Sequence, residues 1–107
     1  MDDTSLLPRD VPLDDYGDVV ALDVDGGFVT ARVVTEQPIT VVDPPLQRAL
    51  LDADYEILAH DNEGFEAEIF FARGSETVGT ILMREGPCPG QVSLRLRYGA
   101  RRYEEDS

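Results

Sequence analysis

Beyond residue 16, hydrophobic and polar residues alternate along most of the chain, and this period of two predicts β-strands. Two β-branched runs, at 19–24 and 28–34, flank Asp25-Gly26-Gly27. A short Asp-Gly connection favours a tight hairpin, because its central residues take positive φ angles. Further runs lie between turns rich in Gly, Pro, Asn and Asp, at 56–59, 65–73, 77–84 and 91–98. The pattern therefore predicts a hairpin followed by a four-stranded meander.

One segment departs from this alternation. Its apolar residues recur at helical spacing, at Leu46, Ala49, Leu50 and Ala53. Asp43 is placed to act as an N-cap, with Pro44 and Pro45 in the first turn, where a missing N–H group costs little. We therefore expect one short helix near 44–54, preceded by a short extended run at 39–42.

These elements predict an α+β fold, with a mainly antiparallel twisted sheet or partly open small barrel of about six to seven strands. The order of strands and helix also resembles the OB-fold, and an OB-like barrel is our alternative. A chain of 107 residues fits one domain, which we place at 17–103. Residues 1–16 are expected to form a flexible acidic N-terminal arm, and 104–107 an acidic C-terminal tail.

The pleat of the meander separates its residues into two faces. The first face is apolar and is the predicted core: Phe65, Ala67, Ile69, Phe71, Ile81, Met83, Val92, Leu94, Leu96 and Tyr98. The second face mixes apolar and charged residues: Glu66, Glu68, Phe70, Val78, Thr80, Leu82, Arg95 and Arg97. With tight hairpins, we expect Phe70 opposite Val78, and Glu68, Thr80 and Arg95 in one row.

Three apolar residues, Phe70, Val78 and Leu82, interrupt the second face, and two interpretations account for them. Either the helix or the N-terminal hairpin covers this face, so that both faces are core. Or these three residues are the apolar centre of a surface with a charged rim that binds a protein partner or a second copy of the chain, as in a homodimer.

Arginine and tyrosine alternate near the end of the chain and suggest a further function. The residues are Arg95, Arg97, Tyr98, Arg101, Arg102 and Tyr103. Arginine binds phosphates and tyrosine stacks on bases, so these six are candidate nucleic-acid-binding residues. The other interpretation is electrostatic balance, of Arg95 and Arg97 by Glu66 and Glu68, and of Arg101-Arg102 by residues 104–106.

The charge composition changes how partners are to be inferred. The chain contains no lysine, nine arginines and 22 Asp plus Glu, for a net charge of -13, whereas average composition would give about six lysines. This composition resembles that of proteins from salt-in halophilic archaea. At about 1 M salt the screening length is roughly 3 Å, so only short-range contacts then carry information about partners.

The chain has one cysteine and one histidine, and neither a leader segment nor a long apolar run is visible in its sequence. The single Cys88 suits a reducing cytosol, and the absence of a basic leader or a long apolar run favours a cytoplasmic protein without membrane contact. His60 beside a turn and Cys88 in a proline-flanked loop form no recognisable catalytic motif. We expect no catalytic residue, cofactor or metal site, and a non-enzymatic module for protein interaction or self-association; nucleic-acid binding is the alternative.

Overall fold

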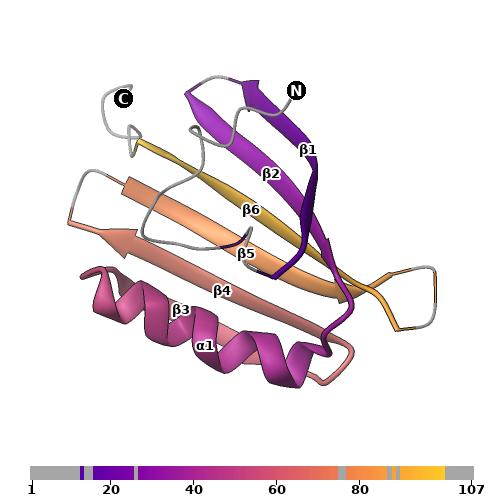
Figure 1. Ribbon diagram of the computed structural model, residues 1–107. Helices are drawn as coiled ribbons and strands as arrows, with labels where there is room; N and C mark the ends of the chain where they lie inside the picture. Colours follow the sequence, from indigo (N-terminus) through magenta and orange to yellow (C-terminus); the bar gives the residue numbers. More distant parts are fainter. Residues whose placement is uncertain are drawn as a thin grey trace.

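Six strands form one antiparallel sheet in the order β1-β2-β6-β5-β4-β3, and a helix packs on one of its faces (Figure 1). The computed structural model describes residues 13, 16–25, 27–74, 77–86, 88 and 90–100. The elements are β1 (Asp18–Asp25), β2 (Phe28–Thr35), α1 (Ile39–Asp52), β3 (Glu56–Asn62), β4 (Glu66–Arg73), β5 (Thr77–Glu85) and β6 (Val92–Ala100). The predicted α+β fold with a mainly antiparallel sheet is therefore confirmed.

The predicted hairpin and meander are both present. Asp25 pairs with Phe28, so a two-residue connection joins β1 to β2, and Gly27 has the positive φ of 85° that this turn requires. Strands β3 to β6 are neighbours in chain order, and β6 then pairs with β2. Because β1 and β3 are the edges of the described sheet, it is open and does not close into the OB-like barrel of our alternative.

The core lies between α1 and the face of the sheet that the apolar alternation predicts. Its fully buried strand residues include Ala31, Val33, Ile69, Ile81, Met83, Leu94 and Leu96. Phe71 is 1% exposed and packs edge-on against Tyr55, with ring centroids 5.1 Å apart. Phe65 was assigned to this face wrongly: it precedes β4 and is 55% exposed.

Helix α1 begins at Ile39, so the extended run expected at 39–42 is wrong. Ile39, Val42, Leu46 and Leu50 are all buried, and their spacing of three, four and four residues forms one helical stripe. Burial of this stripe outweighs the strand preference of β-branched residues. Asp43 is consequently not an N-cap but a buried residue inside the helix.

Two prolines lie inside α1 rather than in its first turn. Pro44 and Pro45 lack the N–H groups that would bond the carbonyls of Thr40 and Val41. Both of these residues are exposed, so water can satisfy their carbonyl groups. The helix thus tolerates the two prolines because the backbone hydrogen bonds that they remove lie on its solvent-exposed side.

The hairpin between β4 and β5 has a different register from the predicted one. Arg73 pairs with Thr77, which leaves a three-residue connection, and Gly74 adopts a φ of 59° in it. Phe70 therefore lies opposite Thr80, while Val78 lies opposite Ala72. The predicted alignment assumed a shorter turn.

Most of the predicted N-terminal arm lies outside the described residues, as does the predicted C-terminal tail. Leu13, however, is described and is fully buried in the core cluster. At least this position of the arm contributes to the folded domain. In the described part of the chain, no helix is long and apolar enough to cross a lipid bilayer.

Candidate protein-binding face of the sheet

The face of the sheet opposite α1 has no covering layer among the described elements. Helix α1 packs on β3, β4 and β5 from the other side, and the N-terminal hairpin extends the sheet sideways instead of covering it (Figure 1). Phe70 accordingly is 39% exposed. The interpretation that the helix or hairpin buries this face is therefore wrong.

We call this surface the open face. Strand pairing assigns to it Asp18, Ala21, Asp23, Phe28, Thr30, Arg32, Val34, Glu56, Ala59, Asp61, Glu66, Glu68, Phe70, Ala72, Val78, Thr80, Leu82, Arg84, Ser93, Arg95, Arg97 and Gly99, of which Ala72 is buried. The predicted partner-binding residues Phe70, Val78 and Leu82 all lie on it. Val78 and Leu82 are half-buried, so the centre of the open face is partly apolar.

Charges on the open face are segregated by strand. One row across the sheet reads, from β2 to β3, Arg32, Arg95, Leu82, Glu68 and Asp61. Two basic residues are followed by one apolar residue and then by two acidic residues. The predicted row of Glu68 with Arg95 is confirmed, but the residue between them is Leu82 rather than Thr80.

Neighbouring like charges make this row unfavourable in an isolated chain. Arg32 lies directly opposite Arg95, and Glu68 directly opposite Asp61, and like charges in such cross-strand positions are destabilising. Arg95 and Glu68 are separated by two strand spacings, roughly 9.6 Å. Among the described residues, no ion pair involves any of these four side chains.

The expected balance of Arg95 and Arg97 by Glu66 and Glu68 is not formed. Glu66 instead faces Arg84 across β4 and β5, with 3.5 Å between Oε2 and Nη2. Both side chains are substantially exposed, at 38% and 61%. An exposed pair of this kind stabilises the fold little, and it leaves the arginines of β2 and β6 available for other contacts.

At a corner of the open face, the exposed Arg97 stacks on an aromatic ring. Its guanidinium lies 4.4 Å from the centroid of the Phe28 ring. Gly99, opposite Phe28, makes room for that ring, because a Cβ atom at Gly99 would lie 2.9 Å from Phe28 Cγ. The cation–π contact therefore depends on a glycine in β6.

The six predicted nucleic-acid-binding residues do not form one surface among the described residues. Arg95 and Arg97 lie on the open face, whereas Tyr98 pairs with Val29 and packs partly against the core on the other face. Arg101, Arg102 and Tyr103 lie outside the described residues. The aromatic residue beside the arginines of the open face is instead Phe28, which the sequence pattern did not single out.

A second polar cluster lies between α1 and the edge strand β3. The buried carboxylate of Asp43 accepts a hydrogen bond at Oδ2 from Asn62 Nδ2, at 2.6 Å, and the same oxygen is hydrogen-bonded to His60 Nε2, at 2.8 Å. Gln47 Nε2 donates to Oδ1 at 3.2 Å. His60 is thus a member of β3 rather than a turn residue, and the cluster attaches the helix to the edge of the sheet.

The sequence pattern could have indicated this cluster, but the prediction of an extended run at 39–42 prevented it. Once the helix begins at Ile39, Asp43 lies on the buried side of α1, next to Val42. Alternation in β3 places His60 and Asn62 on the face of the sheet that α1 covers, where they pair with Ile69 and Ala67. A buried carboxylate beside two hydrogen-bond donors follows from this arrangement.

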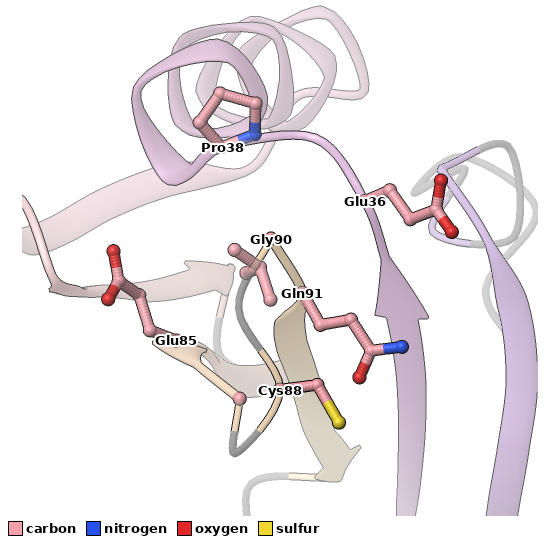
Figure 2. A pocket seen from close by; sticks show the side chains of 8 residues that line it. Glu36, Pro38, Glu85, Cys88, Gly90 and Gln91 are labelled. Carbon is pink, nitrogen blue, oxygen red and sulfur yellow. The ribbon is translucent and has the colours of Figure 1, made fainter.

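The single cysteine lies near a shallow pocket of about 270 Å³ at the β5–β6 end of the sheet. Glu36, Glu85, Cys88 and Gln91 are among its lining residues, and Cys88 is exposed. Figure 2 shows the carboxylates of Glu36 and Glu85 on opposite sides of the pocket, so they do not converge on one point. Among the described residues, no three His, Cys, Asp or Glu side chains gather in a potential metal site.

Comparison with known proteins adds no family assignment. No protein-family model matches the chain, and no curated protein matches it either.

Proposed function

We propose that this chain is a non-enzymatic interaction module that binds a protein through the open face of its sheet. The observation that supports this most directly is a sheet face that none of the described elements covers, with a partly apolar centre and segregated charges on its flanks. Phe70 is 39% exposed there, next to the half-buried Leu82 and Val78. An apolar centre with a polar rim is the usual anatomy of a protein interface.

The working environment that we propose is a salt-rich cytosol. The net charge of -13 and the absence of lysine support it. Under strong screening, long-range attraction or repulsion by the net charge is weak. Binding then depends on shape and on direct contacts, which the open face supplies.

Phe70→Ser is expected to abolish partner binding while the fold is retained, because this side chain is outside the core and at the centre of the open face. The measurement is affinity purification of the tagged chain from cells of its native source in molar KCl. We expect a stoichiometric polypeptide, which includes untagged copies of the chain, to co-elute with the unmodified protein and to be absent with Phe70→Ser.

Leu51→Ser is the matched control, since Leu51 is 56% exposed on α1, away from the open face. Circular dichroism verifies that both variants fold. Equal recovery of the polypeptide with Phe70→Ser and Leu51→Ser would contradict the proposed function.

Nucleic-acid binding is the second candidate, and one observation favours it. Arg32, Arg95 and Arg97 lie together on β2 and β6 beside the Phe28 ring, a combination that suits phosphates and stacked bases. The neighbouring Glu68 and Asp61 oppose it by repelling phosphates. Nuclease-sensitive nucleic acid that co-elutes without any polypeptide, and is lost with Arg95→Gln and Arg97→Gln, would favour this candidate over the first.

A further inference from the structure

One row of the open face has charges that are complementary to the same row read in the opposite direction. This row is Arg32, Arg95, Leu82, Glu68 and Asp61. Reading outward from Leu82, two basic residues lie on one side and two acidic residues on the other. When an identical surface faces this one after a rotation of 180° about Leu82, each basic residue of one row faces an acidic residue of the other. Self-complementarity of this kind is what a two-fold symmetric interface requires.

We infer that the protein that covers the open face is a second copy of this chain, related to the first by a two-fold axis that runs along β5 between the two sheets. This inference rests on the proposed function and names the partner. The rotation keeps each row at its height along the strands and reverses the order of the strands. Strand β6 of one copy then lies over β4 of the other, and β2 lies over β3.

Opposite charges meet in this arrangement. Arg95 of each copy faces Glu68 of the other, and Arg32 faces Asp61, so that the two-fold axis generates each contact twice. The like-charged neighbours within one chain, Arg32 with Arg95 and Glu68 with Asp61, thereby each gain a partner of opposite sign. The electrostatic penalty that the isolated sheet carries is offset only when the second copy is present.

The residues on and beside the axis are also suited to this contact. Val78, Thr80 and Leu82 lie along β5 and meet their own counterparts, which forms an uncharged seam. In the next row, Arg97, which stacks on Phe28 of its own chain, lies over Phe70 of the other copy. Arg84, at the end of β5, also meets its own counterpart across the axis, and this contact between like charges is moderated by the pairing of each Arg84 with Glu66 of its own chain.

Other arrangements fit the face less well. A two-fold axis perpendicular to the strands would place arginines over arginines and carboxylates over carboxylates. A partner of one charge sign, such as a nucleic acid, would match only half of the row. The five strands that overlap under this axis, from β2 to β3, measure about 19 Å by 26 Å from strand spacing and rise. Their projected area of roughly 500 Å², to which side-chain relief adds, is below the roughly 800 Å² that each partner buries in a typical stable interface.

Charge reversal tests the inference on the purified chain, with the dimer dissociation constant in molar KCl measured by light scattering and sedimentation. Arg95→Glu alone and Glu68→Arg alone are each expected to weaken the dimer about tenfold or more. The double variant Arg95→Glu/Glu68→Arg is expected to dimerise more tightly than either single variant, because the inter-sheet pair is restored with reversed sign, but less tightly than the unmodified chain, because each new side chain also faces an opposite charge within its own sheet. A mixture of the two single variants is expected to form heterodimers, because both inter-sheet pairs are restored.

Arg48→Glu and Asp52→Arg are the matched controls, because they make the same charge changes at exposed positions of α1 and are expected to leave the dimer unchanged. An unmodified chain that stays monomeric at every concentration overturns the inference, while capture of another polypeptide in a Phe70-dependent manner would leave the proposed function standing. The inferred two-fold arrangement is also overturned if Phe70→Ser dissociates the dimer but the double variant Arg95→Glu/Glu68→Arg dimerises no better than the single variants. That result would not contradict the open face as the binding surface.

Discussion

Asp43→Ala is expected to lower the free energy of unfolding by about 3 kcal/mol, as measured by chemical denaturation. The Asp43 residue is 1% exposed, and its carboxylate accepts hydrogen bonds from Asn62 and Gln47 and is hydrogen-bonded to His60. Its removal deprives these three side chains of their partner and leaves a cavity between α1 and β3. The helix would lose its polar attachment to the edge of the sheet.

Asp52→Ala serves as the control for this prediction, since Asp52 is an exposed carboxylate on the same helix. A substitution there is expected to change stability by less than about 0.5 kcal/mol. An Asp43→Ala variant that is no less stable than Asp52→Ala would show that the cluster does not hold the helix.

Gly79→Ala is expected to cost about 2 kcal/mol of stability, although glycine is ordinarily a weak strand residue. A Cβ atom at this buried position would lie 2.5 Å from Phe71 Cζ and 2.8 Å from the backbone oxygen of Arg97. Phe71 is 1% exposed and packed against Tyr55, so its ring has little room to move. The clash therefore outweighs the entropy gained by replacing glycine.

The double variant Gly79→Ala/Phe71→Leu separates this clash from a general loss of strand stability. Leucine is smaller than phenylalanine, so the added methyl group should cost less in the Phe71→Leu background than in the unmodified chain. Thermal or chemical unfolding of the four proteins gives this difference directly. Equal costs in the two backgrounds would contradict the steric explanation.

The strands of the sheet could be predicted from the sequence because one rule governs them. Alternation assigned Ala67, Ile69, Ile81 and Leu94 to the core, and all four are buried. The start of α1 could not be predicted in the same way, because Ile39 and Val42 favour strands locally and become helical through packing. Their burial depends on a sheet that forms from residues distant in the chain, and the local secondary-structure propensity of a segment does not report this burial.

The candidate site was only partly predictable for a related reason. The sequence indicated which residues share the open face, but the three-residue connection after Arg73 sets the register and so decides that Leu82 separates Arg95 from Glu68. Arg32 entered the charged row only through the pairing of β2 with β6. That contact joins strands far apart in the chain, and no local pattern reports it.

Thiol labelling at position 80 tests most directly whether a protein covers the open face. Thr80→Cys in a Cys88→Ser background places one thiol at the centre of that face, and Thr40→Cys in the same background places one on the exposed side of α1. In the native assembly, recovered by affinity purification in molar KCl, we predict slow labelling at position 80 that accelerates when Phe70→Ser is added, and fast labelling at position 40 throughout. A thiol at position 80 that reacts equally fast in the recovered assembly and in the Phe70→Ser variant would contradict the account.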